Sequence, residues 1–154
     1  MTLRTQFNDA LKDAMRGKDE RAVGTIRLIL AKLKDLDIAA RPAGNTEGIA
    51  DDAISSMLQG MIKQRRESIV LYDKGNRPDL VKQEGEEITV IERFLPKQMG
   101  EEEIRAAIAA IVTTLGAKDI KDMGKVMAEM KKTYAGQMDF AMAGALVKNK
   151  LTTG

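Results

Sequence analysis

A single proline, Pro96, interrupts the chain between two stretches whose apolar residues recur at helical spacing. Proline lacks the amide donor that a continuous helix needs and clashes with the preceding turn, so a helix normally ends before it. In FLPKQM (94–99), Pro96 either kinks one long helix or separates two packing units. Because each side has its own apolar stripes and capping residues, we favour two units, with a kinked helix as the alternative.

Four helices are expected before Pro96 and three after it, each with apolar residues three or four positions apart. The expected starts are Thr2 or Thr5, Asp19, Asp51 or Asp52, the region of Pro78, Gly100, Asp122 and Asp139. Segments 41–49 and 73–79 carry Gly, Pro and Asn and are expected to be turns. No segment alternates convincingly as a strand would. The predicted fold is therefore all-α, with an N-terminal domain of about four helices (1–95) and a smaller C-terminal three-helix domain (96–154).

Composition agrees with helix packing and suggests a compartment. The 154 residues are 44% apolar but only 3% aromatic, with ten Met and no Cys. A core of aliphatic side chains and Met suits helices better than sheets. The first residues lack the apolar segment of a signal peptide, and no apolar run approaches the roughly 18 to 20 residues that cross a bilayer. We expect a cytoplasmic protein with no membrane contact.

Most catalytic chemistries lack their usual residues here. The chain has no His and no Cys, so the common general base and thiol nucleophiles are missing. The acidic groups Asp51–Asp52 and Glu101–Glu103 lie at expected helix starts, where carboxylates stabilise the helix dipole. We therefore predict no catalytic residue, no metal site and no cofactor.

Arg65 lies on the apolar stripe of the third expected helix and needs a partner there. Glu84 occupies the matching position on the fourth helix. The sequence predicts an Arg65–Glu84 ion pair, and an anion-binding role for Arg65 and Arg66 is the alternative.

The positive charge of the chain gathers near its C-terminus. The net charge is only +2, but residues from Ala117 onward hold 7 basic and 4 acidic side chains. On a helical wheel, Lys121, Lys125 and Lys132 lie opposite the apolar side if the helix extends back to Lys121. Such a face can follow phosphates or can simply be solvated. The candidate RNA-binding residues are Lys121, Lys125, Lys131, Lys132, Lys148 and Lys150.

Two sequence blocks resemble a known family. The segment QRRESIVLYDKGNRPDLVKQEGEEITVIERFLPKQM (64–99), followed by DMGKVM (122–127), resembles the YqeY, or GatB/YqeY-domain, proteins. The resemblance implies an all-helical fold whose C-terminal unit is similar to the tail domain of the B subunit of glutamine-dependent tRNA amidotransferases. That tail is associated with tRNA binding, which makes tRNA the expected partner. The basic turn usual after DMGKVM reads KKTYAGQMDF here, with lysines before Gly136 and none after it.

Three functions are consistent with these features. The first is a non-catalytic accessory module that binds tRNA. The second, implied by the resemblance alone, is a component of a carbon–nitrogen ligase with glutamine as amido donor, active only with amidotransferase partner subunits. The third is a helical adaptor that binds another protein and no RNA. The chain is too short to contain amidase or kinase-like domains, so we expect no enzyme activity from it alone.

Overall fold

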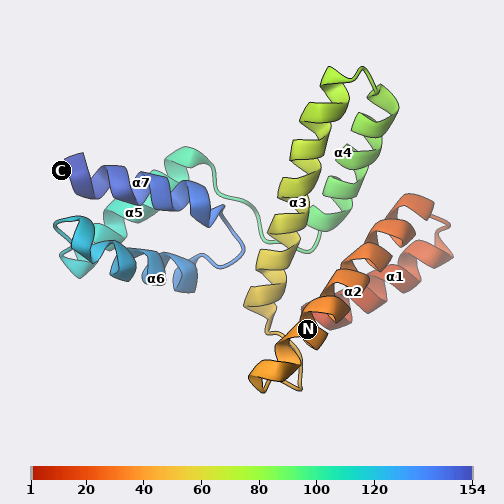
Figure 1. Ribbon diagram of the computed structural model, residues 1–154, viewed down its shortest axis with the longest axis horizontal. Helices are drawn as coiled ribbons and strands as arrows, with labels where there is room; N and C mark the ends of the chain where they lie inside the picture. The colour runs from red at the N-terminus through yellow and green to blue at the C-terminus, as the bar shows by residue number, and fades with distance from the viewer. Residues whose placement is uncertain (1, 154) are drawn as a thin grey trace. The chain divides into compact units, whose positions relative to one another are not determined.

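The structure is a computed structural model that describes residues 2–153. Its elements are α1 (Leu3–Arg16), α2 (Glu20–Ala40), η1 (Arg41–Ala43), α3 (Asp51–Lys74), α4 (Pro78–Glu92), α5 (Glu101–Leu115), η2 (Ile120–Asp122), α6 (Met123–Thr133) and α7 (Phe140–Thr153) (Figure 1). Residues 2–153 contain no strand. The all-α prediction is confirmed, and four helices precede Pro96 while three follow it.

The chain divides into two compact units, Met1–Pro96 and Lys97–Gly154. Helix α4 ends at Glu92, four residues before the proline, and α5 begins at Glu101, so no helix runs through this segment. After the proline, the Met99 N–H donates to the Gln137 carbonyl (2.8 Å), and the Gln98 side chain donates to the Gly136 carbonyl (2.6 Å). The residues that follow Pro96 are therefore held by the second unit.

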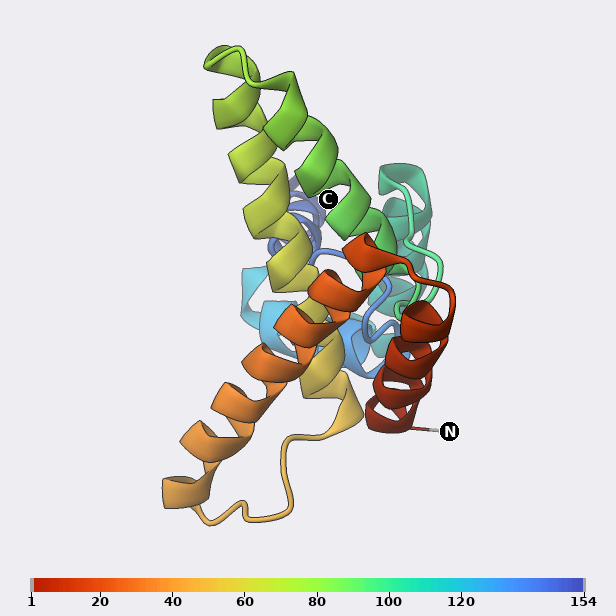
Figure 2. The same ribbon diagram turned by 90° about the vertical axis from the view of Figure 1, so that its right-hand side faces the viewer.

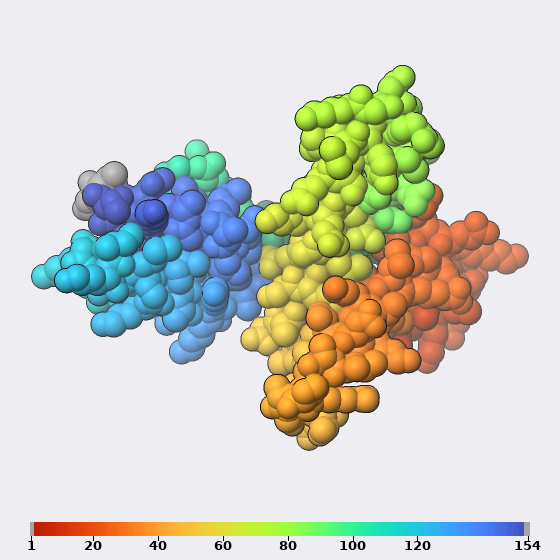
Figure 3. All heavy atoms as spheres, viewed as in Figure 1, coloured from red at the N-terminus to blue at the C-terminus, as the bar shows by residue number. Residues whose placement is uncertain are grey.

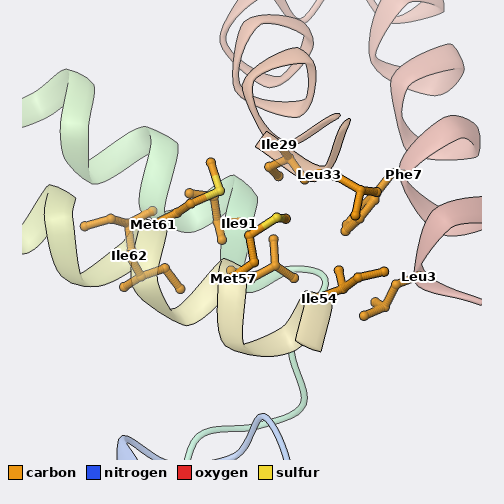
Figure 4. Close-up of a cluster of buried hydrophobic side chains, with 11 residues drawn as sticks. Leu3, Phe7, Ile29, Leu33, Ile54, Met57, Met61, Ile62 and Ile91 are labelled. Carbon is orange, nitrogen blue, oxygen red and sulfur yellow. The ribbon is translucent and has the colours of Figure 1, made fainter. Parts of the chain in front are cut away.

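The first unit consists of two helical hairpins, α1–α2 and α3–α4 (Figure 1). All four helices contribute to its main core, which Figure 4 shows in close-up. Phe7, Ile29, Ile54 and Ile91, one from each helix, are fully buried. Each helix buries one stripe and leaves its other side to charged residues, as the apolar spacing predicts.

The α3–α4 hairpin extends beyond α1 and α2 (Figures 2 and 3). Buried side chains end at Ile62 on α3 and begin only at Glu87 on α4. The residues farther out, which we call the hairpin tip (63–86), pack mainly as two helices. Val70 and Leu71 remain 53% and 68% exposed there.

The second unit packs α5, α6 and α7 around its own core. Ile104 and Ile108 of α5, Val126 and Met130 of α6 and Val147 of α7 are buried. Met138, in the loop before α7, is also buried, although no helical spacing pointed to it. Glycines with positive φ follow two helices: Gly116 (+67°) ends α5 and Gly136 (+76°) follows α6.

A clamp made by Arg4 and Asp37 holds the loop between α2 and α3. The Arg4 guanidinium donates two hydrogen bonds of 2.8 Å to the Asp37 carboxylate and one of 2.9 Å to the Ile49 carbonyl. Asp37 also accepts the Ile49 N–H at 2.9 Å. The hydrogen bond from Arg4 is the main cause that lowers the pKa of Asp37 to about 2. The clamp joins three parts of the first unit, namely α1, α2 and the loop.

Asp37→Asn should destabilise the protein at pH 7 by about 1 kcal/mol, a value reduced for the partial solvent exposure of the pair. The folded-state pKa is depressed, so the contribution of the charge is present above the ordinary pKa and is lost as Asp37 becomes protonated. Urea unfolding at several pH values should show the wild-type advantage intact at pH 5, falling as the pH approaches 2 and gone near pH 1. An advantage that does not change with pH would contradict this account.

Gly48→Ala should cost more stability than Gly44→Ala. Both glycines have positive φ, +103° and +93° respectively, so both variants carry the backbone penalty of about 1 kcal/mol. A Cβ at Gly48 would lie only 2.6 Å from Arg4 Nη2, whereas a Cβ at Gly44 meets no atom within 4 Å. The difference in melting temperature between the two variants measures the cost of the steric clash with Arg4. Equal decreases in melting temperature would show that Arg4 shifts at no cost.

The division into domains 1–95 and 96–154 stays a prediction. It is tested by asking whether the separate fragments fold. Because residues 97–154 contain a complete core cluster, we expect this fragment to unfold cooperatively on heating. Its small size should lower its melting temperature. Circular dichroism of fragment 97–154, with fragment 1–96 as the counterpart, is the measurement. A fragment without a cooperative transition would contradict the division.

Candidate functional site

The six candidate lysines all lie exposed in the second unit. No ion pair between described residues involves any of them. They occur on three elements: Lys121 in η2, Lys125, Lys131 and Lys132 in α6, and Lys148 and Lys150 in α7.

Helix α6 presents two of the lysines on the side opposite its core. Val126 and Met130 are buried, and Met123 and Met127 pack partly buried beside them. Lys125 and Lys132 lie about 140° to 180° around the helix from Met127 and Met123, and about 10 Å apart along its axis. Lys131 lies on the edge of this side. The wheel prediction for Lys125 and Lys132 agrees with the buried positions of α6.

Lys121 is not part of α6, because the α-helix begins at Met123 and Lys121 belongs to the 3-10 turn η2. The helical wheel placed Lys121 beside Lys125 and Lys132 only if the helix extended back to Lys121, and it does not. The C-terminal end of α7 lies beside η2, which brings Lys148 and Lys150 to the same end of the unit as Lys121 (Figure 1). On α7 these two lysines lie about 160° apart around the helix. Lys148 and Lys150 therefore lie on nearly opposite sides of α7 and do not form one basic face.

Asp122 adds a negative charge at this end of the unit. Its carboxylate accepts the Lys118 N–H at 2.9 Å, and this hydrogen bond is the main cause that lowers its pKa. Lys125 and Lys118 lower it further by their charge. Asp122 was expected to cap α6, but its side chain makes no cap hydrogen bond to that helix. The ionised carboxylate reduces the positive potential near Lys121 and Lys125.

In the first unit, Arg65 lies between two carboxylates. Its Nε donates to Glu87 Oε2 at 3.0 Å and lies 3.9 Å from Glu84 Oε2. The side chains of Arg65, Glu84 and Glu87 are only 13%, 17% and 10% exposed. The predicted partner Glu84 is thus within ion-pair range, but the closer partner is Glu87. Sequence reasoning missed Glu87, although its spacing from Glu84 and Ile91 places it on the same helix face.

Arg66 does not join Arg65. Its side chain is 66% exposed and lies 3.5 Å from Glu92 Oε1. An anion at Arg65 would face the carboxylates of Glu84 and Glu87. The geometry therefore favours the ion-pair interpretation of Arg65 over the anion-binding one.

Residues 2–153 contain no group of three or more acidic side chains placed to hold a metal ion. No helix within this range is long and apolar enough to cross a membrane.

Comparison with curated proteins finds relatives among fungal mitochondrial proteins. "Altered inheritance of mitochondria protein 41, mitochondrial" of Lachancea thermotolerans is 34% identical over 107 residues, which cover 68% of this chain and 55% of that protein. The protein of the same name from Eremothecium gossypii is 30% identical over 144 residues, covering 92% and 76%. The chain spans about half the length of the first of these relatives.

These relatives contradict one expectation. The sequence led us to expect a cytoplasmic protein, whereas the relatives are named as mitochondrial proteins. The inference of a cytoplasmic location was therefore wrong.

A family model described as Yqey-like protein matches residues 4–151, nearly the whole chain. This match agrees with the blocks at 64–99 and 122–127 and with the all-helical fold on both sides of Pro96. The chain belongs to the YqeY family.

Proposed function

We propose that this chain is a non-catalytic accessory module whose second unit binds tRNA through exposed lysines. The observation that carries the proposal is the set of six exposed lysines without ion pairs in the described part of the unit. Lysines that form no ion pair with a carboxylate are available to bind a polyanion, and each phosphate contact releases counterions from RNA. The likeness to the amidotransferase B-subunit tail points to tRNA as the RNA.

The arrangement of the lysines indicates how RNA would be bound. Lys125 and Lys132 share one side of α6, with Lys131 at its edge, so a phosphate backbone running along α6 would meet all three. Tyr134 is partly buried in the core, so this side offers no exposed ring for base stacking. We therefore expect recognition of RNA shape and charge rather than of base sequence.

A chain without His or Cys lacks the usual groups for glutamine hydrolysis. An amidotransferase role would therefore place the chemistry in partner subunits. Glutaminase activity of the purified chain above background would favour the amidotransferase component over the accessory module.

Lys125, Lys131 and Lys132 changed together to Ala should remove salt-sensitive tRNA binding. Three phosphate contacts correspond to a slope of about 2 to 3 in a plot of log affinity against log salt. Titration of the full chain with total tRNA at several salt concentrations measures this slope. We expect the variant to lose most of it along with most of the affinity at low salt.

A matched variant controls for net charge. Lys12, Lys32 and Lys34 are exposed lysines of the first unit and make no ion pair between described residues. Changing these three to Ala removes the same charge and should leave the salt slope nearly unchanged. Equal losses in both triple variants, or no binding by the wild type at low salt, would overturn the proposal.

A further inference from the structure

The first unit contains a surface hollow between α2, α3 and α4 that the RNA proposal does not use. Its volume is about 560 Å³. The side chains that matter for its chemistry are Leu28 of α2, Arg65, Glu67 and Leu71 of α3, and Glu84 and Glu87 of α4. It lies at the base of the hairpin tip.

The charged groups of the hollow carry an excess of negative charge. Glu67, Glu84 and Glu87 are acidic, and Arg65 is the one basic side chain that lines it. Arg65 is already engaged, because its Nε bonds to Glu87 and its Nη1 donates to the Met61 carbonyl at 3.1 Å. A positively charged group therefore fits this hollow better than an anion does.

Glu84 is the carboxylate that remains available. It accepts no hydrogen bond from any described residue, and its cationic neighbour, Arg65 Nε, stays at 3.9 Å. Within the described chain, no fully buried side-chain oxygen or nitrogen lacks a hydrogen-bond partner. The oxygens of Glu84 are thus still reached by solvent, although the side chain is only 17% exposed.

Two features of the fold act against an ionised carboxylate at position 84, and only the distant Arg65 acts in its favour. Burial, and then the neighbouring charge of Glu87, raise the pKa of Glu84 above its usual value. A raised pKa means that the ionised form is less favourable in the folded state than in the unfolded state. The surroundings of Glu84 therefore do not favour its ionised form.

The rim of the hollow is apolar and exposed. Leu28 is 49% exposed and Leu71 is 68% exposed, on opposite helices α2 and α3. A small amine bound at Glu84 would leave both leucines in water. A segment of protein is large enough to cover both while it places a basic side chain at Glu84.

We propose that this hollow is a docking site for a segment of another protein that presents a lysine or arginine flanked by apolar side chains. Glu84 receives the cationic group, and Leu28 and Leu71 receive the apolar flanks. The site lies in the first unit and is independent of the lysines assigned to RNA.

Two matched peptides test the proposal on the full chain. One is an amidated 14-residue helix of Ala and Gln with a central Lys and leucines three and four positions away. The other replaces that Lys with norleucine, which keeps the stem and removes the charge. In a titration followed by ¹⁵N NMR, we expect the Lys peptide to bind at least about fivefold more tightly, with shifts at the amides that line the hollow.

Variants assign this preference to the named residues. Glu84→Gln should abolish the preference for Lys, and Leu71→Ser should weaken both peptides. Glu92→Gln is the control, since Glu92 is an exposed carboxylate on the same helix, outside the hollow. A preference that survives Glu84→Gln, or that disappears equally in Glu92→Gln, would overturn the proposal.

Further measurements separate docking from other causes. The melting temperature of Glu84→Gln at pH 7 should equal or exceed that of the wild type, and a marked drop would show a structural role instead. Hexylamine is the small-amine probe, and the protein-partner assignment fails if it binds as tightly as the Lys peptide. Self-association of the wild type that Leu71→Ser abolishes would make a second copy the occupant and would also overturn the proposal.

Discussion

Each helix of this protein has one apolar face, and the fold depends on burying that face against helices that are close in the sequence. Charged residues make up 31% of the sequence, so no helix can be buried all round. Helices α1 and α2 pair, α3 and α4 pair, and these hairpins share one core. Helix α4 ends before Pro96, and the last three helices close a core of their own. The two compact units are the result.

Local signals in the sequence predicted the elements well. Asp19 caps α2 through a hydrogen bond to the Ala22 N–H, Pro78 opens α4 and Gly116 ends α5 in the left-handed conformation. These features depend on residues within one helical turn of each other, which spacing and capping rules describe directly. The buried Met138 was missed because it lies outside any helix, where periodicity says nothing.

Contacts between distant residues could not be predicted in the same way. The Arg4–Asp37 clamp joins residues 33 positions apart, and nothing in the local pattern around either residue requires it. For Arg65, the sequence predicted the correct face of α4 but not the closer of its two carboxylate partners. Glu84 was the only partner predicted, and the register of α3 against α4 shows that Arg65 Nε is nearer to Glu87.

The lysines of the second unit illustrate a deeper limit. A solvated face and a phosphate-binding face need the same residues at the same spacing, so neither the sequence nor the burial of the side chains separates them. What the structure adds is their grouping. Lys125 and Lys132 share one side of α6, Lys148 and Lys150 lie on two flanks of α7, and Asp122 places a negative charge among the lysines near η2.

The extended hairpin tip has a consequence for motion. Residues 63–86 are held mainly by two-helix packing, whereas the base of the same hairpin lies in the four-helix core. Opening the tip exposes little fully buried surface, so its backbone amides should exchange with solvent deuterium through local opening at much less than the full unfolding free energy. Amides near Met57 and Ile91 should exchange only through larger openings. The hairpin thus joins a rigid base to a tip whose order a bound partner can increase.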